Sequence, residues 1–305
     1  YAVDVTSTGT SDRIAITGTV NVAAGTTLRV TKTDTPRYVL GTRYTVLTTT
    51  GGRTGSFATL TGDTRVSRFI NVVQETDANN IYLGVRQTSS FASAAGTRNQ
   101  RAAAAGADAA GNGALFTAIA YLDTDAQAQA AFDQISGEIH SSARGQTVQD
   151  TRFVREAVSA HLQSPDDSRR GLWMSAYGSW GRTNGDGNAA KIQRDIGGFF
   201  MGYDVLRGEE WAVGALAGYG SATIDVAARG SRATTDDIHV GAYGGLKKGN
   251  FIASASLVHM WRNMDTRRNV SIPGFTDTLT ATYQGNVTQL FGEVTYQWAF
   301  GKAAF

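Results

Sequence analysis

Six strand-length runs between Gly171 and Phe300 alternate apolar and polar residues, and this alternation constrains the fold more than any other feature of the chain. The runs read GLWMSAYGSWGRTNGDG, DIGGFFMGYDV, EWAVGALAGYGSATID, DDIHVGAYGGLKKG, FIASASLVHMW and VTQLFGEVTYQWAF. Such runs predict antiparallel strands of a transmembrane β-barrel, in which lipid-facing residues alternate with lumen-facing residues. A soluble barrel or sandwich shows the same alternation, but frequent glycines and aromatic run ends favour the membrane form.

The alternation assigns one set of side chains to lipid and the opposite set to a lumen. The lipid-facing set is Phe199, Met201, Tyr203, Trp211, Val213, Ala215, Ala217, Tyr219, Ile238, Val240, Ala242, Leu290, Val294, Tyr296 and Trp298. The candidate pore-lining residues of the opposite set are Asp204, His239, Tyr243, Gln289, Glu293, Thr295 and Gln297. Five tryptophans fall near run ends, as interfacial girdles require: Trp173, Trp180, Trp211, Trp261 and Trp298.

Composition excludes several other classes of protein. The 305 residues include no cysteine, which excludes a disulfide framework, a cysteine-based zinc site and thiol catalysis. No window holds about 18 consecutive apolar residues, so no transmembrane helix is expected, and a membrane-spanning form of this chain must be a barrel. The net charge of +2 points to no particular partner.

Residues 1–88 are rich in threonine and in short strand-like segments. The inward positions of successive turns are expected to be Val3, Val5, Ile14, Ile16, Val20, Val22, Leu28 and Val30. Either the end of a β-solenoid or a small sandwich would produce this pattern. No fixed-length repeat is present to favour the solenoid.

Residues 89–170 are predicted to form a helical region. Alanine is dense there, and Thr124 with Gln127 has the form of a capping box. The segment DTRFVREAVSAHLQS favours a helix that Pro165 ends. Five glycines are expected to divide the region into several helices: Gly106, Gly111, Gly113, Gly137 and Gly145.

Several long segments resemble the C-terminal region of autotransporters, the type V secretion proteins of Gram-negative bacteria. The segments are SFASAAGTRNQRA, AAFDQISGEIHSSAR, TRFVREAV, GLWMSAYGSWGRTNGDGNAA, IGGFFMGYD, DDIHVGAYGG and LFGEVTYQWAFG, which occur in this order. Upstream, RYTVLTTTGGRTGSF and DANNIYL resemble the stretch that ends an autotransporter passenger. The resemblance covers nearly the whole chain.

The resemblance implies a mainly β fold with three parts. Residues 1–88 would be the last turns of a β-helical passenger with its autochaperone region, 89–170 a helical linker, and 171–305 the first part of an outer-membrane barrel. A complete barrel of this family has twelve strands, whereas six runs are visible. The family's last strand is also missing, because GKAAF before Phe305 looks like a turn into another strand. We therefore expect a fragment that cannot close a barrel alone, and Tyr1 is not expected to be the native start.

The linker of an autotransporter threads the pore, so its charged residues are candidate pore contacts. Arg144, Arg152 and Arg155 are candidate partners of Glu293 on the sixth run; a solvated carboxylate without a partner is the alternative. Some members of the family cut their own linker with a linker asparagine and a barrel acid. This linker offers only Asn99 and Asn112, with no Asn-Asn pair, so self-cleavage is not expected.

No motif for catalysis, a metal or a cofactor is apparent. The four histidines, His140, His161, His239 and His259, lack metal-ligand spacing, and neither GxSxG nor a nucleotide-binding loop occurs. The predicted function is a translocator that carries its own passenger across the bacterial outer membrane to the cell surface. The expected partners are outer-membrane lipid, the passenger, the barrel-assembly machinery and periplasmic chaperones, with no nucleic acid. A surface adhesin, and an enzyme with an upstream catalytic passenger, remain the alternatives.

Overall fold

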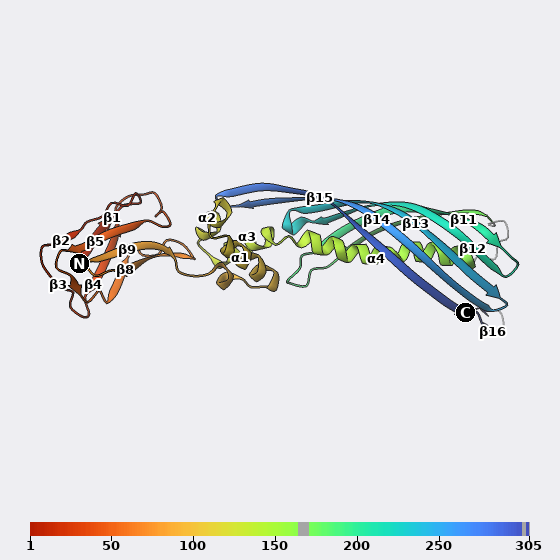
Figure 1. Ribbon diagram of the computed structural model, residues 1–305, viewed down its shortest axis with the longest axis horizontal. Helices are drawn as coiled ribbons and strands as arrows, with labels where there is room; N and C mark the ends of the chain where they lie inside the picture. The colour runs from red at the N-terminus through yellow and green to blue at the C-terminus, as the bar shows by residue number, and fades with distance from the viewer. Residues whose placement is uncertain (164–170, 301–302, 305) are drawn as a thin grey trace. The chain divides into compact units, whose positions relative to one another are not determined.

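The computed structural model describes residues 1–163, 171–300 and 303–304, and the chain divides into two compact units (Figure 1). Unit 1 comprises residues 1–136 and 271–276, and unit 2 comprises residues 137–270 and 277–305. Among the described residues, no helix combines the length and the hydropathy needed to cross a membrane.

Unit 1 begins as a β-helix. Its first strands are β1 (Ala2–Val5), β2 (Ile14–Ile16), β3 (Val20–Asn21), β4 (Thr27–Lys32), β5 (Arg43–Thr49), β6 (Arg53–Thr54) and β7 (Thr59–Gly62). Parallel pairing joins β1 to β4 to β7, β2 to β5, and β3 to β6, so successive turns of the chain stack on one another. This pairing confirms the solenoid. The turns differ in length, because Ala2 aligns with Arg29 whereas Thr27 aligns with Thr59, and this explains the missing repeat.

An antiparallel hairpin, a short 3-10 helix and three α-helices follow in unit 1. The hairpin consists of β8 (Ile70–Thr76) and β9 (Asn80–Gln87), and β9 also pairs with β5. The short helix η1 (Phe91–Ala94) and helices α1 (Arg98–Ala110), α2 (Ala114–Ala120) and α3 (Asp125–Ile135) follow. They share one hydrophobic core with the β-helix, in which Phe69, Phe91 and Phe132 are fully buried. The expected capping box at Thr124 is present, and a second one begins α1 at Thr97.

The glycines of the helical region act differently from one another. Gly111, Gly113 and Gly137 have positive φ and lie between helices, as expected. The expectation for Gly106 and Gly145 was wrong, because both lie inside helices. A glycine in a helix interior costs only about 1 kcal/mol, which a packed helix tolerates. The predicted helical region also divides: α1–α3 belong to unit 1, whereas α4 (Glu138–Gln163) belongs to unit 2, and Pro165 lies outside the described residues.

Unit 2 consists of α4 and a six-stranded antiparallel sheet in sequence order. The strands are β10 (Leu172–Thr183), β11 (Ile192–Arg207), β12 (Trp211–Val226), β13 (Ser231–Lys248), β14 (Phe251–Ile272) and β15 (Phe275–Tyr296). A short helix, η3 (Ala227–Arg229), joins β12 to β13. The six predicted runs are thus confirmed as six strands. After β15, the two-residue strand β16 (Ala299–Phe300) pairs with β17 (Ala303–Ala304). The remaining residues of GKAAF lie outside the described part of the chain.

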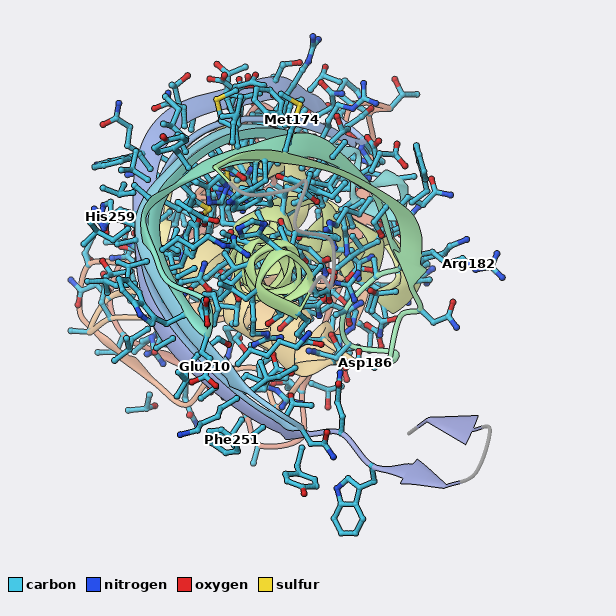
Figure 2. The ribbon with its side chains drawn as sticks, turned by 90° about the vertical axis from the view of Figure 1, so that its right-hand side faces the viewer. Met174, Arg182, Asp186, Glu210, Phe251 and His259 are labelled. Carbon is cyan, nitrogen blue, oxygen red and sulfur yellow. The ribbon has the colours of Figure 1, made fainter. Side chains whose placement is uncertain are left out.

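The sheet curves around α4, which lies along its inner face (Figures 1 and 2). Buried residues of α4, such as Phe153, Val154 and Val158, pack in one cluster with Phe200 and Leu216 of the sheet. The predicted register is confirmed for the lipid-facing residues that lie within the strands, since these side chains lie on the opposite, outer face, while Trp298 follows the end of β15. Trp173 is the exception to the predicted girdle: it lies on the inner face, where its indole N–H donates to the Tyr243 hydroxyl.

Candidate functional site

The inner face of the sheet and α4 carry the largest set of buried polar contacts in unit 2. Six of the seven candidate pore-lining residues lie on this face: Asp204, His239, Tyr243, Gln289, Glu293 and Thr295. The first three are buried, whereas those on the edge strand β15 are half-buried or exposed. The seventh, Gln297, follows the end of β15.

Two carboxylates and two guanidinium groups form a cluster near the middle of α4, which we call the central charge cluster: Asp150, Arg194, Asp237 and Arg262. Arg262 and Asp237 are directly opposite on neighbouring strands, and Arg262 donates from two nitrogens to the two carboxylate oxygens of Asp237. The same guanidinium reaches α4, at 3.2 Å from Asp150 Oδ2, and Arg194 also pairs with Asp150. The four charges sum to zero, which makes their burial tolerable.

A second cluster, the Asp204 cluster, surrounds the C-terminal end of α4: His161, Trp173, Asp204, Arg207 and Tyr243. The His161 Nε2–H donates to Asp204 Oδ1 at 2.9 Å, and the Tyr243 hydroxyl donates to the same oxygen at 2.7 Å. The His161 ring stacks on Trp173 with ring centroids 4.9 Å apart. One wall carboxylate therefore collects donors from the helix and from two strands.

The N-terminal end of α4 has its own polar contact. Glu138 is buried, and its Oε2 accepts from Arg229 Nε at 3.0 Å. Its other oxygen accepts from the backbone N–H of Ala190 at 2.6 Å. We call these three residues the Glu138 contact. Polar groups thus hold α4 to the sheet near both ends and in the middle.

The expected pairing of Glu293 with a linker arginine is corrected by the structure. Glu293 Oε2 accepts instead from Ser159 Oγ of α4 at 2.6 Å. Arg144, Arg152 and Arg155 are exposed; Arg144 lines a cavity with Met260 and Tyr283 of the sheet, and Arg152 lies over the Phe153 ring. Phe153 and Val154 pack against the sheet, while the neighbouring Arg152 and Arg155 side chains remain exposed.

Aromatic rings and glycines shape the apolar part of the inner face. The Tyr177 ring stacks on Phe153 of α4 and on Phe200 of β11, with centroids 4.7 and 5.0 Å apart. A Cβ at Gly202 would lie 2.4 Å from the Trp173 ring, and one at Gly220 would lie 2.2 Å from the Tyr177 hydroxyl. Glycine is needed at these positions because the large rings lie flat across the neighbouring strands.

The outer face changes from apolar to polar at one row of residues that are paired in register across neighbouring strands. Phe199, Tyr219, Ile238 and Trp261 form this row across β11–β14, and all four point outward. The next outward row is polar or small, with Gly197, Ser221, Asp236 and Asn263. Figure 2 shows Met174, His259 and Phe251 on the outside of the curve.

The apolar band that ends at this row approaches the height of the apolar band of a membrane barrel. On β12 it runs from Trp211 to Tyr219, which spans about 26 Å along the strand and about 20 Å along the axis of a tilted barrel. Beyond the row the polarity reverses. Inward Ile224, Val226 and Met264 pack with Ile139 of α4, while the outward residues are polar.

Sequence reasoning missed most partners of the polar clusters, although a signal for two of them was present. Asp237 and Arg262 stand next to the outward Ile238 and Trp261, so the alternation places both on the inner face. The contacts of Asp150 and Glu138 had no such signal, because they depend on how far α4 lies along the sheet. Among the described residues, no group of three or more acidic or histidine side chains is arranged to hold a metal ion.

Comparison with known proteins gives consistent matches. The family model described as autotransporter beta-domain matches residues 172–305. Two proteins named extracellular serine protease, both from Serratia marcescens, are 27% and 24% identical over 98% of this chain. The chain spans 34% of the length of each of these relatives. The transport unit of the autotransporter AIDA-I from Escherichia coli is 14% identical, with a TM-score of 0.31 over 49% of this chain and 55% of that one.

Proposed function

Because the chain carries the C-terminal region of an autotransporter, with the beta-domain over residues 172–305, we propose that it moves its own passenger across the bacterial outer membrane and displays it on the cell surface. The observation that carries this proposal is α4 on the inner face of the curved sheet, held there by three polar contacts. A helix in this position is the segment that remains inside a barrel after the preceding part of the chain has passed through it.

The outer face supports a membrane location for the sheet. Its apolar band is bounded by aromatic side chains, and the band height of about 20 Å approaches the roughly 25 Å of outer-membrane barrels. The part of the sheet beyond Tyr219 and Trp261 has a polar outer face and an apolar inner face, which suits a wall that stands in water. We place that part outside the membrane, on the side to which α4 delivers unit 1.

The candidate pore residues take two roles in this proposal. Asp204, His239 and Tyr243 line the wall against α4, and Gln289, Glu293, Thr295 and Gln297 line or flank it at β15. The exposed arginines Arg144, Arg152 and Arg155 line the pore around α4 in the complete barrel. Folding of the passenger outside the cell, and not nucleotide hydrolysis, would draw the chain outward.

In this proposal, any catalytic activity of the full-length protein belongs to the passenger. The names of the two Serratia relatives favour a serine protease passenger over an adhesin. Self-cleavage by a pore asparagine is not proposed, because α4 contains no asparagine and Asn99 and Asn112 belong to unit 1.

The proposal is tested by an epitope tag placed immediately before Tyr1 in the full-length protein. We expect an antibody to bind the tag on intact cells, and we expect a variant without residues 171–305 to keep the tag inside. A matched control carries the tag at the turn residue Glu210, which should become accessible only after the outer membrane is permeabilised. A tag before Tyr1 that stays inaccessible, although the barrel is in the outer membrane, would refute export.

A further inference from the structure

We infer that the Glu138 contact, the central charge cluster and the Asp204 cluster together set the axial position of α4, and therefore the point at which export of the chain stops. This inference rests on the proposed function. It assigns Glu138, Asp150 and His161 of α4 as positioning residues, which act through their partners on the wall.

The three residues are spread along almost the whole helix. Asp150 lies twelve positions after Glu138, and His161 lies eleven positions after Asp150. At the rise of an α-helix these intervals are about 18 and about 17 Å. All three side chains are buried against the sheet, and each has a charged partner on a different part of the wall.

Apolar packing alone does not define this position. The buried apolar residues of α4 recur at four-residue intervals, as Ile139 and Ala143, or Val154 and Val158. A slip of one turn, about 5.4 Å, would place Val158 near the present position of Val154 and keep an apolar stripe on the sheet. A position one turn away therefore keeps much of the apolar burial of Val154 and Val158.

The polar contacts remove this degeneracy. A slip of one turn would carry Asp150 beyond hydrogen-bonding distance of Arg262 and would place an apolar residue against that guanidinium. The same slip would separate Glu138 from Arg229 and His161 from Asp204, because all three move together on a rigid helix. The slip would leave the buried carboxylates of Glu138 and Asp150 without their guanidinium partners, which is strongly unfavourable. Only one axial position satisfies all three contacts.

The contacts also suit a segment that stops, as distinct from one that passes. Asp204 and Asp237 keep partners on the wall when α4 is absent, through Tyr243, Arg207 and Arg262. The two acids of the wall are therefore already paired for a chain in transit. The helix α4 adds an acid for Arg194, a second acid for Arg262 and the Glu138 carboxylate for Arg229 at the same time.

Disulfide cross-linking in the full-length protein tests the inference, since residues 1–305 contain no cysteine that would compete. Cysteines replace Ser159 and Glu293, whose side chains touch, and report the observed position of α4. Two further pairs, Arg155→Cys with Glu293→Cys and Gln163→Cys with Glu293→Cys, report slips of one turn in either direction. When Glu138, Asp150 and His161 are unchanged, the protein should give the 159–293 cross-link and little of the other two.

The triple variant Glu138→Gln, Asp150→Asn and His161→Gln should raise the ratio of slipped to unslipped cross-links by about tenfold or more. The matched control, Glu156→Gln, removes an exposed acid from the same helix and should leave the ratio unchanged. Exchanging one pair, Glu138→Arg with Arg229→Glu, should return the ratio toward the wild-type value relative to Glu138→Arg alone.

Surface display of the passenger, measured on the same cells, separates the two levels of the argument. If display is normal but the triple variant gives only the 159–293 cross-link, the positioning role is refuted and the proposed function stands. If unit 1 does not reach the surface even in the protein with Glu138, Asp150 and His161 unchanged, the proposed function itself is refuted.

Discussion

Asparagine in place of Asp150 removes one charge from the central charge cluster while keeping the side-chain volume. Arg262 would still donate to both carboxylate oxygens of Asp237, whereas Arg194 would keep its hydrogen bond to Gln146 Oε1 at 3.2 Å. Breaking a buried ion pair costs about 3–5 kcal/mol. Because Arg262 remains paired, we expect the lower value, a loss of about 3 kcal/mol in the docking of α4, or roughly a hundredfold in the docked fraction.

Hydrogen exchange of the α4 amides, measured in the full-length protein in lipid, reports this docking free energy. A double-mutant cycle with Arg194→Gln isolates the pair, and we expect a coupling of about 1–3 kcal/mol between the two substitutions. Gln149→Ala, on the exposed face of α4, is the matched control and should change exchange little. A loss below about 1 kcal/mol for Asp150→Asn, or strictly additive effects in the cycle, would refute the account of this cluster.

Three further predictions concern the wall, the membrane band and unit 1. Gly202→Ala should destabilise the folded barrel by about 1–3 kcal/mol in urea unfolding, because its Cβ would overlap the Trp173 ring, whereas Gly181→Ala, with open space around it, should have little effect. Ala217→Arg, inside the apolar band, should cost about 2–4 kcal/mol in the same assay, and Thr223→Arg, beyond the Tyr219 row, close to none; equal costs would contradict the assigned membrane boundary. Hydrogen bonds from Lys32 and Ser7 lower the pKa of Asp34 to about 2, and those from Tyr82 and Asn79 lower the pKa of Asp77 to about 2. Both pKa values lie below the pKa of an aspartate in an unfolded chain. The stabilisation that these two carboxylates provide is therefore complete above about pH 4 and is lost as the pH falls toward 2. Hydrogen exchange of residues 1–88 should show this loss, and Asp77→Asn should reduce it.

The strands within the membrane band were predictable because lipid outside and a small-residue wall inside impose one phase of alternation. The same rule explains where the prediction stopped. Beyond Trp261 the outward residues Asn263 and Asp265 are polar, while inward Met264 is apolar. The phase of hydrophobicity thus reverses where the sheet leaves the bilayer, so β14 and β15 are longer than the runs that the membrane pattern identified.

The polar contacts of α4 were less predictable, for a physical reason. Alternation states which face of a strand a residue occupies, and it placed Asp204 and Tyr243 correctly on the inner face. It does not state how far a helix is inserted along that face. The partners of Glu138, Asp150 and His161 depend on this distance, and a shift of one turn would change all of them.

The β-helix was ambiguous for a different reason. Inward residues such as Val3 and Leu28 alternate in the same way in a solenoid and in a sandwich. Parallel pairing between distant segments, such as that of Ala2 with Arg29, distinguishes the two folds. Unequal turns conceal this pairing from any search for a fixed repeat.

The most direct test of the central claim is the side of the membrane on which the two ends of α4 lie. Single cysteines at the exposed residues Thr8 in unit 1 and Glu209 in the β11–β12 turn are suitable, because residues 1–305 contain no other cysteine. In intact cells that make the full-length protein, a membrane-impermeant maleimide should label the cysteine at position 8, and should label the one at position 209 only after permeabilisation. Labelling of both positions from outside, or of neither, would contradict export of unit 1 through the barrel.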